Sequence, residues 1–507
     1  MPNSVQSLLH TGSSGIIVET ECHLSNGLPA IIIVGLGNRA VDEAKERIRS
    51  AFASCKLTMP TKRITINLAP ADVPKESTNF DLAIAIAILQ ASGQTKRLLT
   101  LQEAAIGELG LDGRIRPVRG IVGKLLSGRA RGIDTFYIPS DNLAQALLVP
   151  DVTIIPLQNL RDLYLGLAGG PELIRHKTGN GAYVPQPKHK VDQKLSDVVG
   201  QAAAKRALEI AAAGNHNILL SGAPGTGKSM LAKALPSILP PPTQSEILEI
   251  TQIHSLSSSD YDEIVASRPF RSPHHSASSV SIIGGGNSVR PGEISLSHRG
   301  VLFLDEMPEF GRKTVEALRQ PLEDGVITVA RAKESITYPA IFLLVATANP
   351  CPCGYYGSPT PCSCSAAAII NYHRKISGPI LDRIDLFVNV ESVEHRHLLR
   401  KVNGGTDDVI RLRVTEARQA QTQRFKGKAT TNATMTNPQI RALALLRPDA
   451  EALLNHAAER LHLSARSYMR TIKVARTIAD LAKSSTIETT HVTEALQYRS
   501  HVASVVE

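Results

Sequence analysis

A glycine-rich segment that ends in lysine and serine is the clearest chemical motif of the sequence. The segment GAPGTGKS (residues 222–229) fits the pattern G-x-x-x-x-G-K-[ST], follows the largely apolar strand expected at residues 217–220 and precedes a helical pattern over residues 230–239. Backbone N–H groups of such a loop surround phosphates, its lysine reaches the β and γ phosphates, and its hydroxyl holds Mg²⁺. The motif therefore predicts an ATP–Mg²⁺ site. Its binding residues are expected to be Gly222, Ala223, Pro224, Gly225, Thr226, Gly227, Lys228, Ser229 and Met230.

Two carboxylates and an amide stand at the ends of two later apolar runs. The run GVLFLDE (residues 300–306) ends in Asp305 and Glu306, and residues 341–346 lead into Thr-Ala-Asn349. A strand that ends in Asp-Glu is common by itself, but beside a phosphate loop it supplies a second Mg²⁺ contact and a base for water. We expect Asp305 to act with Ser229 on the metal, Glu306 to be the general base and Asn349 to orient the attacking water.

Arginines in two later segments are candidates for contact with the γ phosphate. Arg383 lies in SGPILDRID (residues 377–385), where it fits an arginine finger that is worth roughly 10³ to 10⁵ in rate. A finger that acts in trans requires a neighbouring subunit and hence a ring; the alternative is an ion pair with Asp382 or Asp385. In SARSYMR (residues 464–470) either Arg466 or Arg470 fits the task, and we favour Arg466 at the helix start.

Four of the six cysteines crowd into one short loop. The pattern is C-x-C-x₈-C-x-C, formed by Cys351, Cys353, Cys362 and Cys364. Four thiolates so close together predict a tetrahedral, structural Zn²⁺ site, although C-x-C is tighter than the usual C-x₂₋₄-C spacing. The alternative is a set of reduced thiols, or a reversible disulfide, in a loop shaped by its Gly and Pro residues.

Patterns of apolar residues divide the chain into three domains with α/β architecture in the first two. Residues 1–172 alternate β-branched runs, such as residues 30–34, with helical stretches, such as residues 81–91. Residues 173–194 have the polar, Gly/Pro-bearing composition of a linker. Residues 195–392 form a second α/β domain that carries the phosphate loop and the Cys-rich loop 351–364. Residues 393–507 are rich in Ala, Leu, Arg and Glu and predict a helical lid.

The overall composition bears on partners and location. The 507 residues are 42% apolar and contain 56 Lys and Arg against 46 Asp and Glu, giving a formal charge of +10. This excess favours a polyanionic partner such as DNA, with a merely soluble basic protein as the alternative. The N-terminus lacks the pattern of a signal peptide, and no apolar run is long enough to span a membrane. We expect a cytoplasmic protein.

Several long segments resemble the Mg-chelatase-like AAA+ ATPase family of bacteria. They are GLG (35–37), Gln201, GAPGTGKS, RSPHHSASSVSIIGGG (271–286), PGEISLSHRGVLFLDEMPEF (291–310), ANPCPCGYYG (348–357), SGPILDRID and SARSYMRTIKVARTIADL (464–481). The resemblance implies a homo-hexameric ATP-driven motor that translocates on single-stranded and branched DNA and promotes branch migration. It also implies a role in integrating DNA during natural transformation. The alternative is a chelatase-like motor that drives metal insertion or remodels a protein partner.

The N-terminal domain resembles the Lon protease domain of the S5 type. The resemblance is carried by KESTNFD (residues 75–81) and GLDGRIRPVRG (110–120), and it places Lys124 at the catalytic lysine position. Asn79 stands at the serine position, and an amide cannot form an acyl intermediate. Ser77 would take that position only in a shifted alignment. We therefore expect a non-proteolytic domain that serves assembly or DNA contact.

Two insertions correspond to pore loops of related motors. The first, residues 268–290, carries Arg271, His274, His275 and a run of three glycines; the second, the hairpin 325–338, carries Arg331 and Lys333 near its tip. Cationic side chains on flexible loops favour contact with the DNA backbone, and the scarcity of aromatic residues argues against sequence-specific binding. The alternative is that both are solvated loops without a specific task.

Overall fold

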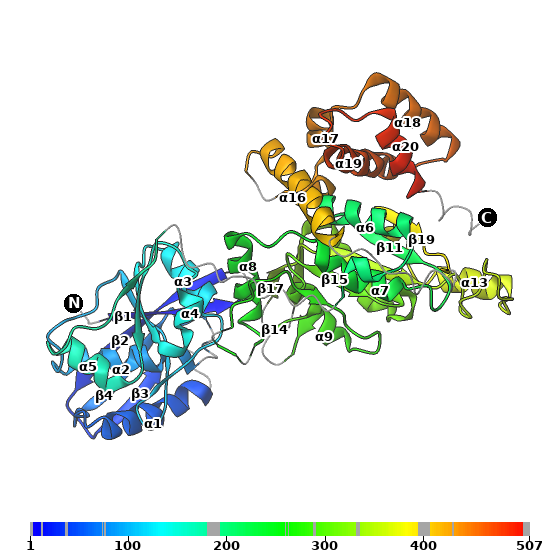
Figure 1. Ribbon diagram of the computed structural model, residues 1–507. Helices are drawn as coiled ribbons and strands as arrows, with labels where there is room; N and C mark the ends of the chain where they lie inside the picture. The colour runs from blue at the N-terminus through cyan, green and yellow to red at the C-terminus, as the bar shows by residue number, and fades with distance from the viewer. Residues whose placement is uncertain are drawn as a thin grey trace. The chain divides into compact units, whose positions relative to one another are not determined.

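A computed structural model gives the fold of the chain (Figure 1). It describes residues 4–499 except 12–13, 36–38, 74, 76–77, 180–192, 259, 262, 287–289, 331–334, 394–405 and 428–429. The chain divides into two compact units, each made of three segments. Unit 1 comprises Met1–Gln186, Thr243–Ala266 and Ala330–Tyr338, and unit 2 comprises Pro187–Pro242, Ser267–Val329 and Pro339–Glu507.

Unit 1 is built on an eight-stranded sheet with the order β10-β9-β8-β5-β1-β2-β4-β3. Its strands are β1 Ser4–Thr11, β2 Ser14–Ser25, β3 Ala30–Val34, β4 Arg63–Ala69, β5 Glu103–Ala105, β8 Thr135–Pro139, β9 Thr153–Leu157 and β10 His176–Lys177. Strands β1 and β2 pair antiparallel. The pairs β1–β5, β5–β8 and β8–β9 are parallel. A separate hairpin joins β6 Glu108–Leu109 to β7 Ile115–Arg116. The mixed α/β fold expected of the N-terminal region is confirmed.

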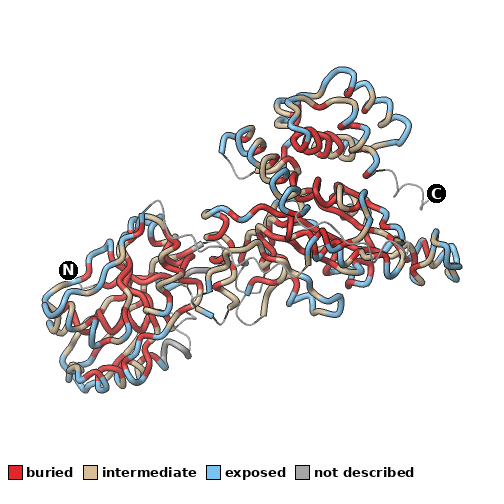
Figure 2. The backbone as a smooth tube through the Cα atoms, viewed as in Figure 1, coloured by how far each residue is buried: buried red, intermediate tan, exposed pale blue. Residues whose placement is uncertain are grey.

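Helices pack on the sheet of unit 1 to form its core. They are α1 Arg39–Ser54, α2 Asp81–Ala91, α3 Ile121–Arg129, α4 Leu143–Ala146, α5 Leu160–Leu167 and α8 Gln244–His254. Helix α2 is apolar on every side, and all its residues from Asp81 to Gln90 are buried, as expected of a helix in a domain core. Figure 2 shows the buried backbone following the sheet and the helices that cover it.

Helix α8 belongs to unit 1 although it follows the phosphate loop in the sequence. A capping box of Thr243 and Glu246 starts the helix. Leu248 then packs against the apolar cluster around α3, and Gln145 Nε2 donates to the Glu263 carbonyl at 3.0 Å. The segment Thr243–Ala266 is therefore an insertion that folds with the N-terminal region. The domain boundaries predicted from sequence at residues 172, 194 and 392 stay a prediction. They do not account for the insertion, which they place in the second domain.

Unit 2 holds a five-stranded, fully parallel sheet with the order β12-β15-β18-β11-β19. The strands are β11 Ile218–Ser221, β12 Phe270–Arg271, β15 Val301–Leu304, β18 Leu343–Ala348 and β19 Leu386–Asn389. Strands β15 and β18 are buried along their whole length, which suits a sheet covered on both faces. The carboxyl ends of β11, β15 and β18 lie at one edge, where parallel sheets bind ligands.

Helices surround this sheet and form the C-terminal bundle. They are α6 Ala202–Gly214, α7 Lys228–Ala234, α9 Ser279–Ile283, α10 Glu293–Leu296, α11 Arg312–Ala317, α12 Arg319–Asp324, α13 Ala366–His373, α14 Gly378–Leu381, α16 Thr406–Arg424, α17 Asn437–Leu443, α18 Pro448–Arg460, α19 Ala465–Leu481 and α20 Thr489–Gln497. Two further sheets have two strands each: β13 Gly284–Gly285 pairs with β14 Arg290–Pro291, and β16 Val326–Ala330 pairs with β17 Ser335–Pro339. The parallel core and the helical lid expected from sequence are confirmed.

Buried ion pairs and hydrogen bonds tie the lid to the core of unit 2. The Asp407 carboxylate on α16 accepts the backbone N–H groups of Leu195 and Ser196, each at 2.7 Å, and the Ser237 hydroxyl at 2.6 Å. Arg470 on α19 pairs with Asp385 at 2.5 Å. Burial alone would raise the pKa of Asp385, but Arg470 and other cations hold it well below its usual range.

A membrane span is absent from the part of the chain that the structure describes. None of the helices there combines the length and the apolar character needed to cross a bilayer.

Candidate ATPase active site

The glycine-rich loop runs from the end of β11 to the start of α7. Gly225 and Gly227 adopt φ angles of +78° and +91°, a conformation that residues with a Cβ rarely take. A Cβ on Gly222 would lie 2.3 Å from the carbonyl oxygen of Val390. Backbone conformation and close approach therefore explain the glycines, and they shape a loop that can surround a phosphate.

Lys228 is buried at the centre of this loop. Its Nζ donates to the carbonyls of Gly222 at 2.7 Å and Ala223 at 2.8 Å, and to Asn349 Oδ1 at 3.2 Å. These contacts use all three ammonium donors. Burial lowers the pKa of Lys228, and two nearby carboxylates oppose that shift. The structure thus brings the phosphate-loop lysine and the expected water-orienting amide into direct contact.

The expected metal residues, Ser229 and Asp305, are in direct contact. Ser229 Oγ lies 3.0 and 2.9 Å from the two carboxylate oxygens of Asp305. Thr347, which is fully buried, donates its hydroxyl to Asp305 at 2.6 Å and accepts the Glu306 N–H at 2.8 Å. A hydroxyl and a carboxylate are oxygen ligands of the kind Mg²⁺ prefers, so the donor set fits this ion.

Thr347 is a further residue of the site, which the sequence motifs did not indicate. It ties the metal carboxylate of Asp305 to the backbone of Glu306 from the adjacent strand. A signal was present, because a hydroxyl stands among apolar residues in β18, one residue before the strand ends. Hydroxyls buried in strands need partners, and here both partners belong to the site.

Glu306 adopts a left-handed backbone conformation and leaves its side chain exposed. Its φ of +54° costs a residue with a Cβ roughly 1–2 kcal/mol. The hydrogen bond to Thr347 helps to hold this conformation. Strained residues of this kind cluster at functional sites. Glu306 is thus directed into solvent at the sheet edge, where water is accessible to a base.

The arginines expected near the γ phosphate form ion pairs with acidic side chains of the same chain. Arg383 is buried, donates to the Pro379 carbonyl at 2.6 Å and forms an ion pair with Glu323. Arg466 Nη2 lies 3.6 Å from the same Glu323 carboxylate. Burial and then the neighbouring arginines lower the pKa of Arg383. Arg383 and Arg466 thus share one acid, whereas Arg470 is engaged with Asp385.

The first insertion contains one neutralised cation and two exposed histidines. Arg271 donates through Nε and Nη2 to the two Glu293 oxygens at 2.6 and 2.7 Å, and the hydrogen bonds to Glu293 raise its pKa. His274 and His275 are exposed, and their rings lie 4.1 Å apart between centroids. Arg331 and Lys333 of the second insertion lie outside the described residues.

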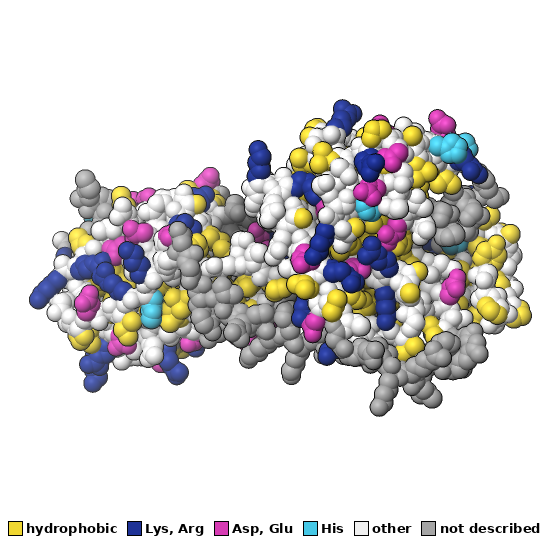
Figure 3. Space-filling view, turned by 45° about the horizontal axis from the view of Figure 1, so that its top comes forward, with side chains coloured by type: hydrophobic (Ala, Val, Ile, Leu, Met, Phe, Trp, Pro, Cys, Tyr) yellow, Lys and Arg dark blue, Asp and Glu magenta, His cyan; other side chains and the backbone are white. Residues whose placement is uncertain are grey.

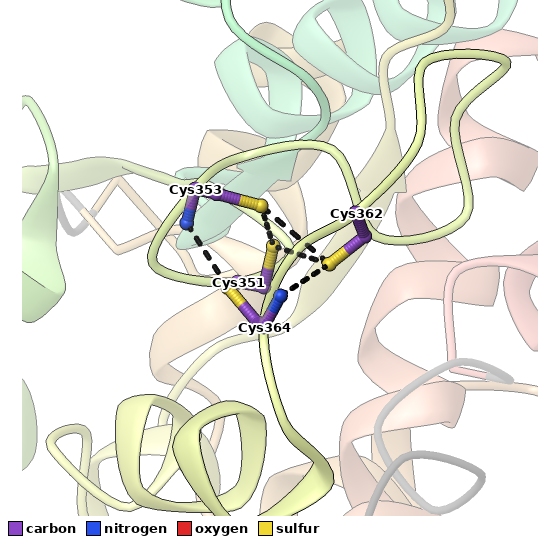
Figure 4. Close-up of side chains that lie close together, drawn as sticks. All are labelled: Cys351, Cys353, Cys362 and Cys364. Atoms are coloured by element: carbon purple, nitrogen blue, oxygen red, sulfur yellow. Dashed lines mark hydrogen bonds between the residues drawn. The ribbon is translucent and has the colours of Figure 1, made fainter.

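The four cysteines after β18 form one compact cluster (Figure 4). Their sulfur atoms all lie within 4.8 Å of one another, with contacts of 3.3, 3.5 and 3.7 Å among Cys351, Cys353 and Cys362. Thiolates placed tetrahedrally at about 2.3 Å from Zn²⁺ have sulfur atoms about 3.8 Å apart. Backbone N–H groups of Cys353, Tyr356 and Cys364 also donate to cysteine sulfurs of the cluster. The four thiols therefore fit a single metal ion, as the sequence predicted.

Lys124 and Asn79, the residues of unit 1 that the likeness to the Lon protease domain singles out, are both buried. Lys124 is buried and donates to the Arg119 carbonyl, and burial lowers its pKa from 10.5 to about 8. Asn79 is also buried, and its amide donates to the Leu8 carbonyl at 3.1 Å. Ser77 lies outside the described residues.

The strand order, the phosphate loop and the Ser229–Asp305–Thr347 arrangement define a P-loop protein of the AAA+ class. The chain belongs to the magnesium chelatase ChlI family. The family model "Magnesium chelatase, subunit ChlI" matches residues 194–398, "Subunit ChlI of Mg-chelatase" matches residues 20–142, and the ChlI C-terminal model matches residues 405–499.

Curated relatives extend over nearly the whole chain. The chain is 41% identical to "Competence protein ComM" of Haemophilus influenzae, over 98% of this chain and 97% of that protein. It is 40% identical to "Uncharacterized protein YifB" of Escherichia coli, over 97% of each. Similarity to the "Magnesium-chelatase 67 kDa subunit" of Heliobacterium mobile is 27% and covers 31% of this chain.

Proposed function

We propose that the chain is an ATP-driven AAA+ motor that assembles as a hexamer, translocates on DNA in the cytoplasm and promotes branch migration. The process it serves is the integration of incoming DNA during natural transformation. The observation that carries the ATPase part is the Lys228–Asn349 and Ser229–Asp305–Thr347 contacts at one sheet edge. The observation that carries the DNA part is full-length similarity to a relative named as a competence protein.

The residues of the site divide the chemistry of hydrolysis among them. Lys228 binds the β and γ phosphates of ATP, and Asn349 orients the attacking water. Glu306, which is exposed and lies near enough to Lys228 to affect its pKa, accepts the proton of that water. Ser229 and Asp305 would hold Mg²⁺, which supplies charge neutralisation at the phosphates when bound.

Ring assembly supplies the last catalytic group. Arg383 acts in trans on the γ phosphate of a neighbour, with Arg466 reaching the nucleotide of its own subunit. Because Arg383 is paired with Glu323 in the single chain, this pair opens when the ring forms. Hydrolysis then depends on ring assembly, because Arg383 is released from Glu323 only in the ring. Such a dependence suits a motor whose subunits act in order.

Mixed subunits test the ring. Neither Arg383→Ala nor Lys228→Ala subunits should hydrolyse ATP alone, but a mixture should regain activity wherever an intact Arg383 faces an intact Lys228. As a control, mixing Lys228→Ala with Glu306→Gln subunits leaves no site complete and should restore nothing. Full turnover by a strictly monomeric protein at saturating ATP would contradict the hexamer.

DNA contact is assigned to the two insertions. His274 and His275 are exposed, whereas Arg271 is bound to Glu293 and must be released to meet a phosphate. Arg331 and Lys333 are assigned to the second contact on sequence alone. On the face shown in Figure 3, Lys and Arg are interspersed with Asp and Glu rather than gathered in one stripe.

A four-way DNA junction discriminates between the candidate functions. The proposed motor moves the branch point only with ATP, and DNA stimulates its hydrolysis. The alternative, a chelatase-like motor that drives metal insertion or remodels a protein, rests on the partial similarity to the magnesium-chelatase subunit. ATP hydrolysis without any response to DNA would favour that alternative.

The four-cysteine cluster is assigned one structural Zn²⁺. Four thiolates fill a tetrahedral shell and leave no position for an activated water, so this metal takes no part in hydrolysis. Metal analysis of protein purified without chelator should give about one zinc per chain, which is lost in Cys351→Ser/Cys364→Ser. Protein that carries no metal, with a melting temperature unchanged in that variant, would contradict the assignment.

A further inference from the structure

We propose that the zinc-closed cysteine loop is a working part of the nucleotide site, because it braces the phosphate loop at Pro224 and the water-orienting residue Asn349. This inference rests on the proposed ATPase function and concerns the same site. The loop begins two residues after Asn349, at Cys351, and ends at Cys364, just before α13. The loop and the helix α13 that follows it contact the site and its flanking residue at three places, through Gly354, His373 and Tyr372.

The first contact joins the loop to Pro224. Gly354, the residue after the ligand Cys353, is buried and adopts a φ of +87°. A Cβ placed on Gly354 would lie 2.6 Å from both Cδ and Cγ of Pro224, so the loop backbone packs directly on the proline ring. Pro224 belongs to the segment that surrounds the phosphates, and any shift of Gly354 is transmitted to it.

The second and third contacts run from helix α13, which follows the loop, to the two residues that precede Cys351. Ser365 follows Cys364 and caps α13 by accepting the Ala368 N–H at 3.2 Å. At the other end of α13, a His373 ring nitrogen lies 3.0 Å from the Pro350 carbonyl oxygen. Burial raises the pKa of Tyr372 to about 12, and the nearby backbone of Asn349 opposes that shift, so Tyr372 lies close to the water-orienting residue.

The metal is needed because the loop has little else to fix its shape. Between β18 and α13 the described residues form turns without helix or strand, and the sequence PCPCGYYGSPTPCSCS offers few apolar side chains for a core. Among the four cysteines only Cys351 is buried. A soft divalent ion bound by four thiolates would replace the missing core, since ligand bonds order loops that cannot fold alone.

Two glycine variants of the full-length protein distinguish the effect of the contact with Pro224 from the effect of backbone strain in the loop. Gly354→Ala introduces a methyl group against Pro224 and should weaken binding of a fluorescent ATP analogue about tenfold while zinc stays at one per chain. Gly357→Ala is the matched control, because Gly357 has a φ of +74° but a Cβ there would meet nothing within 4 Å. It carries a similar backbone strain and should leave ATP affinity unchanged.

A double-mutant cycle tests whether Gly354 acts through the proline ring. Pro224→Ala removes the ring atoms that clash, so Gly354→Ala/Pro224→Ala should bind ATP no more weakly than Pro224→Ala alone. Unchanged affinity in Gly354→Ala, or equal losses in both glycine variants, would overturn the brace.

Zinc removal tests the same inference from the metal side. Cys351→Ser/Cys364→Ser should lose zinc and weaken ATP binding, and both effects should match those of chelator-treated wild type. Refilling the wild type with Co²⁺ should restore affinity together with the absorption bands of a tetrahedral thiolate site. Loss of zinc with unchanged ATP affinity would overturn the inference. Failure of the DNA assays alone would overturn the motor function and leave the brace standing.

Discussion

The protein has a buried lysine in each unit, Lys228 in unit 2 and Lys124 in unit 1. Comparing them shows that the surrounding side chains determine whether a buried lysine belongs to a catalytic site. Both donate to backbone carbonyls, and burial lowers the pKa of both. Lys228 also contacts Asn349 and lies near the carboxylates of Asp305 and Glu306. For Lys124, burial is the one cause of its lowered pKa.

The two lysines differ in the side chains that the surrounding strands place near them. Parallel strands in unit 2 end together, and their ends bring a hydroxyl, two carboxylates and an amide around one lysine. In unit 1 the residue at the expected nucleophile position is Asn79, whose amide is bound to the Leu8 carbonyl. Lys124 has a lowered pKa although the partner described for its ammonium is a backbone carbonyl, so a shifted pKa alone does not identify an active site.

The largest expected effect comes from removing Lys228. Lys228→Ala should weaken nucleotide binding and reduce ATP turnover by about a hundredfold or more, because no other ammonium reaches the phosphates from this loop. Lys124→Met is the matched control and should leave turnover at the wild-type rate. Equal losses in both variants would break the distinction between the two lysines. Steady-state ATPase rates over a range of ATP concentrations measure this.

Replacing the base should separate binding from hydrolysis. Glu306→Gln keeps the size and the polar contacts of the side chain but cannot accept a proton, so turnover should fall by roughly 10²–10⁴ while ATP affinity is retained. Nucleotide binding and single-turnover hydrolysis, measured on the same preparation, give the two quantities. Wild-type turnover would exclude Glu306 as the base.

Thr347 should have a smaller effect that is specific to the hydroxyl. Thr347→Val keeps the shape but leaves Asp305 and the Glu306 N–H without their shared partner. Because a hydrogen bond to a charged group is worth roughly 1.5–3 kcal/mol, kcat should fall by roughly ten- to a hundredfold. Thr347→Ser keeps the hydroxyl and should restore most of the rate. Equal rates in the Val and Ser variants would assign Thr347 a packing role only.

The smallest effect on turnover, and a distinct effect on stability, is expected at Lys124. Its folded pKa of about 8 lies below 10.5, so the unfolded chain binds more protons between these values and stability rises with pH across that window. Lys124→Met removes the penalty for charging the buried group, which amounts to about 3 kcal/mol at pH 7. The variant should therefore be more stable below pH 8, with the difference vanishing near pH 10.5. Denaturant unfolding at several pH values measures it, and a difference independent of pH would contradict the buried charge.

Much of the fold was predictable because local patterns agree with it. The strand predicted at residues 30–34 is β3 Ala30–Val34, and the helix predicted at 81–91 is α2 Asp81–Ala91. Prediction was weaker where contacts between residues far apart in the sequence determine which part of the fold an element packs on. Helix α8 has the capping and periodicity of an ordinary core helix, yet it packs on unit 1 because its apolar face finds a partner there.

The candidate site divides in the same way. Sequence alone determined the phosphate loop, the Asp305–Glu306 pair and the cysteine spacing, because each depends on residue types at short, fixed separations. Only the tertiary structure decided that Thr347 joins Asp305 to Glu306, that Arg383 and Arg466 share Glu323, and that Gly354 packs on Pro224. Each of these contacts joins segments that lie far apart in the chain, and their distances follow from the sheet order and the packing of helices rather than from any local pattern.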